Sequence, residues 1–406
     1  MGQSQGESPY MMVGQEKLIV LPEYSTQSFP ESEIPGHLGE ILWRNYGNQV
    51  SVEFPSPKTG GQWQLASQGW VGYIPLTPEL GFHLSPKVPL KNLFGMLEYA
   101  YRLKSFNFLK GLISCDSLEE FYEQLAKFLA LRVLDRGKKG FYRAYVPQMG
   151  QLPYVTGRID LRQTSQRPWS VKLECGYEEY TSDIEENQIL TWTFQHILRS
   201  GLCTERTLSV VRKAYRILYD LATPEPFKPQ DCVCRLYNRL NQDYQPMHAL
   251  CRFFMDQSGP SHQIGNRTML PFLVNMARLY ELFVAEWLKS NLPAEWRIKA
   301  QEIITMGQSH AIQFNIDLVL YDSLNNVPRF VLDTKYKSSK YPESADIEQI
   351  VAYAQMKGCH EAVLIYPLRL NEPLDEKLKS VRIRSLAFPI DDNLERGGQS
   401  FIRELF

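Results

Sequence analysis

Apolar and polar residues follow a short alternating pattern in the first part of the chain. Between residues 40 and 85, apolar and polar positions alternate in runs such as 50–54 and 69–74, and glycine and proline separate these runs. Alternation at every second position is typical of β-strands with one buried face. We therefore predict β-hairpins or a small barrel in this stretch. Residues 1–35 are polar and interrupted by proline around one apolar, strand-like run, 17–22, and we predict a loosely ordered arm.

Helical spacing follows these strands. Apolar residues lie three and four positions apart in residues 92–103 and 117–134, and this spacing predicts two amphipathic helices. Two further apolar runs, 157–161 and 171–175, are expected to be strands. The N-terminal half is therefore expected to mix strands and helices.

A second helical section begins near residue 184. The spacing predicts helices over residues 184–198, 204–221 and 246–255, and a group of prolines ends the second of them because a helix interior does not tolerate proline. Residues 257–267 have loop composition. The longest amphipathic helix is predicted for residues 269–290.

The length of 406 residues favours two domains. We predict an N-terminal domain of strands and helices at residues 1–183. The second domain, residues 184–406, is expected to contain a helical segment and then an α/β core at about 268–406. The expected fold class is α/β, or α+β for the chain as a whole.

Composition excludes several classes of protein. Hydrophobic residues make up 44% and charged residues 22% of the chain, which excludes a wholly disordered or fibrous protein. The net charge of -1 neither supports nor excludes nucleic acid as a ligand. The seven cysteines are scattered without a paired zinc motif, so we expect reduced thiols. No apolar run is long enough for a membrane span or signal peptide, so a cytoplasmic protein is expected.

The C-terminal third has its own order of elements: strand, turn, strand, helix, strand. The corresponding residues are 312–321, 323–326, 329–336, 345–356 and 361–366. Two acidic residues, Asp317 and Asp333, lie within the two paired strands and are surrounded by apolar residues. A buried carboxylate is costly unless it is compensated, and a divalent cation can compensate it.

The spacing of these residues predicts a catalytic site. Side chains on a strand return to the same face at every second position, so Asp333 and Lys335 share a face. A hairpin would bring Asp317 beside them. Paired carboxylates suit Mg²⁺, which can activate water for phosphodiester hydrolysis while Lys335 orients that water or neutralises the phosphate. The alternative for the Asp-x-Lys tripeptide alone is an exposed ion pair on an edge strand.

This arrangement resembles the PD-(D/E)XK nuclease superfamily, in which an acid on one strand is followed by Asp/Glu-x-Lys on the next. Asp317 matches the first acid and Asp333-Thr334-Lys335 the second element, while Ile316 stands where proline is usual. The resemblance implies a restriction-endonuclease-like core that cuts nucleic acid with Mg²⁺.

Five more residues extend the candidate site. Glu281 matches a helical acid that often completes the metal shell in this superfamily, although it could simply be a polar position on an amphipathic helix. Gln349 and Tyr353 match a QxxxY pattern and share a helix face, so we expect them to support the site or contact DNA, with plain packing as the alternative. Lys337 and Lys340 form a small basic edge that could contact phosphates, although such runs are often only solvated.

Over nearly its full length the chain resembles the McrC family, the nuclease subunits of McrBC-type restriction systems. The segments that carry the resemblance are residues 84–87 leading into 93–97, 152–160, 183–190, and 279–284 together with 333–337. The resemblance implies an endonuclease that docks on a ring-forming AAA+ GTPase, stimulates GTP hydrolysis and cuts double-stranded DNA near modified cytosines. It assigns docking to residues 1–183. The chain has no G-x-x-x-x-G-K-[ST] loop, so GTP is expected only on the partner.

Two other functions stay open at this point. One is a catalytically silent adaptor that binds DNA and activates the motor, and the other is a stand-alone nuclease of a mobile element. The segment around Arg158 also has two interpretations: a turn glycine followed by an exposed Arg158–Asp160 ion pair, or a contact with the partner. Histidine and serine motifs of the common hydrolases and metalloproteases do not occur.

Overall fold

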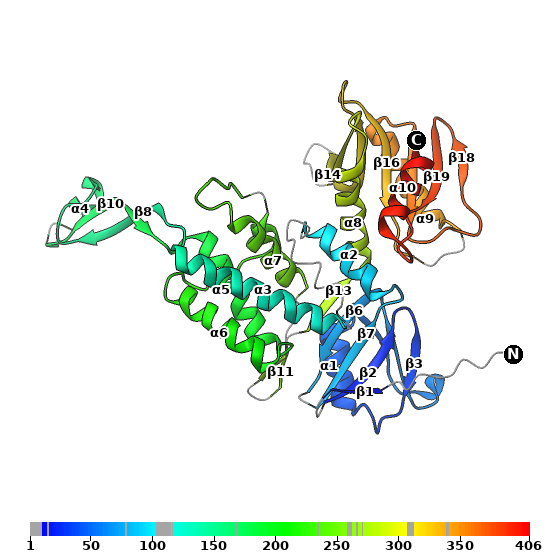
Figure 1. The fold of residues 1–406 in the computed structure, drawn as a ribbon, viewed down its shortest axis with the longest axis horizontal. Helices are drawn as coiled ribbons and strands as arrows, with labels where there is room; N and C mark the ends of the chain where they lie inside the picture. The colour runs from blue at the N-terminus through cyan, green and yellow to red at the C-terminus, as the bar shows by residue number, and fades with distance from the viewer. Residues whose placement is uncertain are drawn as a thin grey trace. The chain divides into compact units, whose positions relative to one another are not determined.

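The computed structural model describes residues 10–13, 16–77, 79–102, 115, 117–167, 169–233, 235–257, 262–264, 267–269, 271–306, 312–337 and 341–406 (Figure 1). The chain forms two compact units. Unit 1 combines Met1–Phe121 with Gln257–Phe406, and unit 2 is Tyr122–Asp256. The functional division predicted at residue 183 falls inside unit 2, and it stays a prediction about docking.

The N-terminal part of unit 1 contains two sheets. The larger has the order β1 (Tyr10–Val13), β2 (Glu16–Pro22), β7 (Leu80–Ser85), β6 (Trp70–Pro75) and β13 (Phe272–Asn275). The smaller has the order β3 (Thr26–Phe29), β5 (Trp63–Ser67) and β4 (Val50–Glu53), with helix α1 (Gly36–Tyr46) and the short η1 (Pro57–Thr59) nearby in the chain. Side chains of both sheets and of α1 share one apolar core. The prediction of strands between residues 40 and 85 is confirmed from residue 50 onward, but it is wrong for residues 40–46, which belong to helix α1.

The prediction of a loosely ordered arm is wrong for residues 16–35. Strand β2 lies inside the five-stranded sheet, paired with β1 on one side and with β7 on the other. Ile19, Leu21 and Phe29 are fully or almost fully buried in the core. The strand is stable because its neighbours come from residues 70–85, a pairing that the polar composition of the arm does not reveal.

Strand β13 joins the C-terminal part of unit 1 to the N-terminal sheet. It pairs antiparallel with β6, with Leu273 opposite Gly72. Gly72 has φ 129°, and a Cβ there would lie 2.1 Å from the Phe272 carbonyl oxygen, so the close approach of the two strands requires glycine. Two predictions in this region are wrong, and pairing over this distance in sequence explains the second of them.

The first wrong prediction is the loop at residues 257–267, where strands β11 (His262–Ile264) and β12 (Arg267–Met269) form a small hairpin. The second is the start of the long helix. Helix α8 covers Met276–Asn291 and begins after β13, where the Asn275 side chain accepts a hydrogen bond from the Arg278 amide. Residues 272–275 are apolar enough to be read as helix, but their pairing with β6 makes them a strand.

The C-terminal part of unit 1 is a six-stranded mixed sheet flanked by helices (Figure 1). Its strand order is β14 (Trp296–Met306), β15 (Ile312–Asp322), β16 (Pro328–Thr334), β17 (Glu361–Tyr366), β19 (Val381–Ala387) and β18 (Asp375–Leu378). Strands β14 to β16 are antiparallel, and β16, β17 and β19 are parallel. Helices α9 (Ser344–Lys357) and α10 (Leu394–Leu405) complete it. The predicted order of strand, turn, strand, helix, strand is confirmed.

Helix α2 (Leu90–Ala100) connects the two parts of unit 1. The Asn92 amide donates hydrogen bonds to the carbonyl oxygens of Ile390 and Asp392, and the Tyr99 ring packs edge-on against Phe283 of α8. These contacts fix the N-terminal sheet beside the C-terminal part within one unit.

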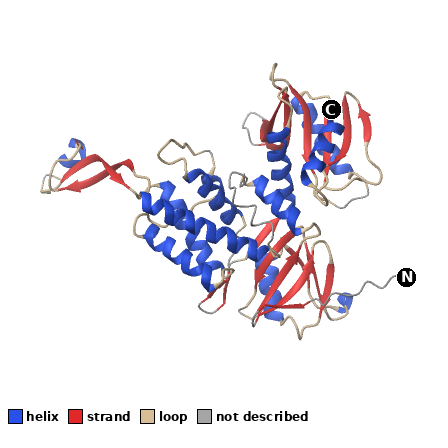
Figure 2. Ribbon diagram, in the orientation of Figure 1, coloured by secondary structure: helices blue, strands red, loops and turns tan. Residues whose placement is uncertain are grey.

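Unit 2 is mostly helical (Figure 2). Its helices are α3 (Leu118–Lys139, whose first residues belong to unit 1), α5 (Glu185–Ser200), α6 (Glu205–Tyr219), the short η4 (Pro229–Cys232) and α7 (Tyr244–Asp256). They confirm the helices predicted at 117–134, 184–198, 204–221 and 246–255. Within the described residues no helix is long and apolar enough to cross a membrane, and the described cysteines are free thiols.

One element of unit 2 extends away from its helices (Figure 1). Strands β8 (Ala144–Leu152) and β10 (Leu173–Thr181) form a long antiparallel pair, with β9 (Arg158–Ile159) and helix α4 (Leu161–Ser165) toward its far end. We call residues 144–181 the ribbon. At its base, the buried Asn187 side chain donates to the carbonyl oxygens of Tyr142 and Ser182 and accepts from Tyr244, so α5 anchors both strands.

The overall architecture is mixed α and β, as the sequence predicts.

Candidate functional site

The two candidate acids are brought together where strands β15 and β16 separate. Backbone pairing between these strands ends at Leu318 and Leu332. Beyond that point, Asp317 Oδ2 accepts hydrogen bonds from the Thr334 amide at 3.0 Å and from the Thr334 hydroxyl at 3.1 Å. The Asp317 carboxylate thus accepts the hydrogen bond from the Thr334 amide that a backbone carbonyl would accept in a regular antiparallel ladder. The predicted hairpin that places Asp317 beside Asp333 is confirmed.

The Lys335 ammonium lies among several acceptors. Its Nζ is 2.7 Å from Asp333 Oδ2, 3.4 Å from Asp346 Oδ1 and 3.0 Å from Gln349 Oε1. The backbone at Lys335 is held by a hydrogen bond from its amide to the Ile365 carbonyl. The lysine is therefore fixed in direction and in charge, beside the acid pair rather than on an exposed edge.

Helix α9 supplies the support for this lysine. The Gln349 amide donates to the Tyr353 hydroxyl at 2.9 Å, and Tyr353 is almost fully buried. Residues four apart share a helix face, so Gln349 and Tyr353 lie on one face of α9. We call the chain of hydrogen bonds from Lys335 through Gln349 to Tyr353 the relay. The shared face predicted for these two residues is confirmed, and their role toward DNA stays a prediction.

Asp346 is a member of this cluster that the sequence analysis missed. It is 5% exposed and lies near the ammonium groups of both Lys335 and Lys337. An acid in the first turn of a helix is usually explained by the helix dipole. The signal for Asp346 in the sequence is its position three residues before Gln349, which places both residues on the same helix face.

The carboxylates of the site repel one another. Burial, together with the nearby charges of Asp317 and Asp333, raises the pKa of Glu281 to about 7. Burial and the Asp317 charge also raise the pKa of Asp333 to about 6, and burial raises the pKa of Asp317 despite its bonds to Thr334. Burial disfavours the Lys335 ammonium, but the charge and hydrogen bond of Asp333 and the charges of Asp346 and Asp317 together outweigh burial, so the lysine pKa is raised. The site therefore holds more negative charge than one ammonium balances.

This donor set fits a hard divalent cation. Carboxylate oxygens are the ligands that Mg²⁺ prefers, and a cation would relieve the repulsion that raises these pKa values. Among the described residues, however, no group of three or more His, Cys, Asp or Glu side chains is arranged to hold a metal ion. The structure brings Asp317 and Asp333 together and Glu281 within their electrostatic reach, so ligation by Glu281 stays a prediction.

The basic edge that the sequence predicts is only partly described. Lys337 Nζ lies 2.8 Å from Glu343 Oε2 and 3.1 Å from Asp346 Oδ2, so its charge is already compensated within the protein. Its contact with phosphate stays a prediction. Lys340 lies outside the described residues.

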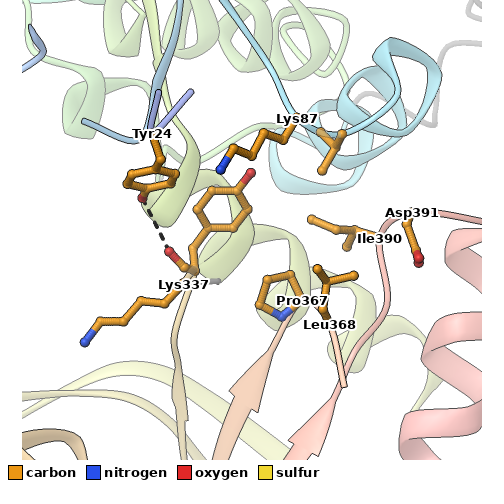
Figure 3. A pocket seen from close by; sticks show the side chains of 9 residues that line it. Tyr24, Lys87, Lys337, Pro367, Leu368, Ile390 and Asp391 are labelled. Atoms are coloured by element: carbon orange, nitrogen blue, oxygen red, sulfur yellow. Dashed lines mark hydrogen bonds between the residues drawn. The ribbon is translucent and has the colours of Figure 1, made fainter. Parts of the chain in front are cut away.

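A cavity of about 110 Å³ opens beside the end of strand β16 (Figure 3). Its walls come from both parts of unit 1: Tyr24, Lys87, Val88, Tyr336, Lys337, Pro367, Leu368, Ile390 and Asp391. The Tyr24 hydroxyl donates to the Tyr336 carbonyl at 3.5 Å, and the Lys87 ammonium lies 5.3 Å from the centre of the Tyr24 ring (Figure 3). The N-terminal sheet therefore contacts the strand that carries Lys335.

Tyr336 is the centre of this contact, and sequence analysis did not identify it. Its hydroxyl donates to Glu23 Oε2 at 3.1 Å, and Glu23 is fully buried at the end of β2. The ring centre of Tyr336 is 5.9 Å from that of Tyr280, the residue before Glu281. Tyr336 thus links β2 to the backbone beside two candidate site residues, Lys335 and Glu281.

The segment around Arg158 lies on the ribbon. Gly157 has φ 64°, and a Cβ there would lie 2.3 Å from the Gly176 carbonyl oxygen, so the turn requires glycine. Asp160 caps helix α4 by accepting from the Gln163 amide. Arg158 is exposed, and within the described part of the chain it forms no salt bridge. The expected Arg158–Asp160 ion pair is therefore not formed.

Comparison with known proteins agrees with this architecture. The model of a family described as McrBC 5-methylcytosine restriction system component matches residues 65–367. No curated protein matches the chain.

Two solved structures are similar. One is a chain of the refined half-complex from the tetradecameric assembly of Thermococcus gammatolerans McrB AAA+ hexamers with bound McrC. It is 16% identical, and the likeness covers 96% of this chain and 99% of that chain with a TM-score of 0.52. The other is from the cryo-EM structure of the Thermococcus gammatolerans McrBC complex, with 16% identity, coverage of 68% and 88%, and a TM-score of 0.40. At this level of identity the first likeness shows a shared fold.

Proposed function

The chain belongs to the family of McrBC 5-methylcytosine restriction system components, and from that premise we propose that it is the subunit that cuts DNA. Its reaction is Mg²⁺-dependent hydrolysis of a phosphodiester bond in double-stranded DNA that carries modified cytosine. It acts when docked on an AAA+ GTPase, whose GTP hydrolysis it stimulates, and GTP binds only that partner.

The observation that carries the proposal is the arrangement of Asp317, Asp333 and Lys335 where β15 and β16 separate. Asp317 and Asp333 would hold Mg²⁺, with Glu281 as the third acid. Bound there, Mg²⁺ supplies a Lewis acid that activates water and offsets charge on the phosphate. Lys335 stays protonated because Asp333 favours its charged form, so it can hold a water or a phosphate oxygen by a charge-assisted hydrogen bond. Gln349 keeps the lysine in place.

The ribbon supports the proposed partner interaction. It exposes many large hydrophobic side chains: Tyr145, Met149, Tyr154, Val155, Leu161, Trp169, Val171 and Tyr180. Large apolar side chains exposed in such number on one element favour a protein interface. The Thermococcus gammatolerans assembly contains McrC bound to McrB AAA+ hexamers, and we extend this mode of assembly to the present chain, with the ribbon as a docking element.

A reconstituted cleavage reaction tests the proposal. The protein is mixed with the AAA+ GTPase of its own system, GTP, Mg²⁺ and plasmid DNA with or without 5-methylcytosine. We expect wild type to cut only the methylated plasmid and Asp333→Ala to leave it intact while still stimulating GTP hydrolysis. Asp375→Ala, an exposed acid on strand β18 of the same sheet, is the matched control and should cut normally.

Other outcomes support the alternative functions. If wild type stimulates GTP hydrolysis but leaves DNA as intact as Asp333→Ala does, the chain is an adaptor. Cleavage without the GTPase would instead indicate a stand-alone nuclease.

A further inference from the structure

Gln301 has an unusual backbone conformation at one position of strand β14. Its φ is 50°, in the left-handed region that residues with a Cβ rarely adopt. The pairing of β14 with β15 continues on both sides, with Ala300 opposite Leu318 and Glu302 opposite Ile316. The ladder thus skips only Gln301 and the residue that would face it, which is Asp317.

This irregularity directs the Gln301 side chain to a second acid of the site. Gln301 Nε2 donates a hydrogen bond of 3.0 Å to Glu281 Oε1 on helix α8. The neighbouring residue Glu302 instead binds Tyr321 and Lys357, so consecutive residues of β14 serve opposite faces of the sheet. One residue therefore interrupts the ladder opposite Asp317 and binds the Glu281 carboxylate, which lies within electrostatic reach of Asp317.

We propose that Gln301 is a positioning residue that orients the Glu281 carboxylate toward the acid pair of Asp317 and Asp333. The proposal rests on the proposed function, because the orientation matters only if these acids hold a cation. Gln301 donates to Oε1 alone, so this bond leaves Oε2 available to a cation, and as a neutral donor Gln301 adds no charge to the crowded site.

The strained backbone supports a role beyond folding. Gln301 is exposed, so its side chain adds little to the apolar core. Strain of this kind persists where the surrounding structure imposes it, and such residues cluster at active sites. A glutamine that served only the sheet would be more stable in an ordinary strand conformation.

Mg²⁺ binding to the isolated full-length protein tests the proposal without relying on cleavage. Titration calorimetry and Mg²⁺-dependent thermal unfolding are measured for wild type, Gln301→Ala, Gln301→Gly, Glu281→Ala and the Glu281→Ala/Gln301→Ala double variant. We expect Gln301→Ala to weaken Mg²⁺ binding about tenfold, the lower end of the effect of residues that orient metal ligands. Gln313→Ala, an exposed glutamine on the neighbouring strand β15, is the matched control and should bind like wild type.

Gln301→Gly separates positioning from folding. Glycine accepts the left-handed conformation freely, so we expect the metal-free variant to unfold at a temperature equal to or above that of wild type, yet to bind Mg²⁺ as weakly as Gln301→Ala does. A purely structural glutamine predicts the opposite pattern: lower metal-free stability and unchanged Mg²⁺ affinity. That pattern would overturn the proposal.

The double variant tests whether Gln301 acts through Glu281. In that case Gln301→Ala causes no further loss of affinity once Glu281 is alanine, and additive losses contradict the proposal. Asp333→Ala separates this inference from the proposed function. If Asp333→Ala loses Mg²⁺ while Gln301→Ala binds like wild type, only the inference fails; if Asp333→Ala also binds like wild type, both fail.

Discussion

Two antiparallel strand pairs of this chain have opposite surroundings. Strands β15 and β16 lie inside the six-stranded sheet and carry acids among buried residues, and Asp333 is only 2% exposed. Strands β8 and β10 belong to the ribbon and carry apolar residues in solvent, such as Tyr145, which is 67% exposed. In the segment before β10, Trp169 is 80% and Val171 90% exposed. The first pair buries charge and the second exposes hydrophobic surface. Each costs stability, and each therefore indicates a ligand that compensates it: a cation for the first pair and a protein for the second.

The largest expected effect comes from a mutation that removes an acid from strand β16 and leaves the ribbon unchanged. Asp333→Ala should lower DNA cleavage by about three powers of ten or more, because a metal at such a site contributes several kcal/mol to the barrier and each 1.4 kcal/mol is tenfold in rate. Stimulation of the partner's GTP hydrolysis should not change. A parallel loss of both activities would mean that the two strand pairs do not act independently.

The reciprocal change is made on the ribbon. Trp169→Ser together with Val171→Ser should reduce stimulation of GTP hydrolysis about tenfold, since exposed aromatic anchors often dominate protein interfaces. Mg²⁺ binding and the unfolding temperature should stay as in wild type because both side chains are exposed. The readout is GTP hydrolysis at increasing concentrations of the variant. Unchanged stimulation would place the docking surface elsewhere.

A smaller effect is expected from the relay on helix α9. Gln349→Ala removes the acceptor that holds Lys335 and should slow cleavage by about tenfold, with little change in Mg²⁺ affinity. Gln355→Ala, an exposed glutamine on the same helix, is the control. Equal rates for the two variants would mean that the bond from Gln349 has no catalytic consequence.

The smallest expected effect is a pH dependence of stability in the metal-free protein. Folding raises the pKa of Glu281 to about 7 and of Asp333 to about 6, mainly by burial. A carboxyl with a raised pKa contributes its full stability below its unfolded pKa and loses it as the pH rises through the folded value. In EDTA, the unfolding temperature should therefore fall by a few degrees between about pH 5 and pH 8.

Two additions sharpen this last prediction. Mg²⁺ should reduce the fall, because it compensates the ionised carboxylates, and Asp333→Asn should reduce it without metal. If the unfolding temperatures of wild type and Asp333→Asn both rise over this pH interval, the raised pKa values of these carboxyls are contradicted.

The candidate site could be predicted because its main residues are close in sequence. Asp317, Asp333 and Lys335 belong to one hairpin, and Gln349 follows on the next helix, so alternation and helical spacing suffice to group them. Gln301 and Tyr336 could not be predicted in this way. The first depends on a local break in a ladder, and the second on a contact with Glu23 more than 300 residues away.

The errors in the fold have the same physical origin. Residues 17–22 were predicted as a strand-like run within a loosely ordered arm, and residues 272–275 as part of a helix, yet both segments are strands of one sheet. Their neighbours in that sheet, β7 and β6, come from residues 70–85. Strand formation depends on cross-strand neighbours more than on the segment itself, and a single sequence does not identify those neighbours.

Strand β13 has a consequence for the order in which the chain is made. It completes the N-terminal sheet, but it leaves the ribosome roughly 200 residues after strand β6, its partner in that sheet. At typical rates of synthesis this takes about 10 to 40 seconds. All of unit 2, including the ribbon, is translated in that interval. We therefore expect a nascent chain to hold a complete ribbon while the edge of β6 is unpaired and the hairpin of β15 and β16 does not yet exist.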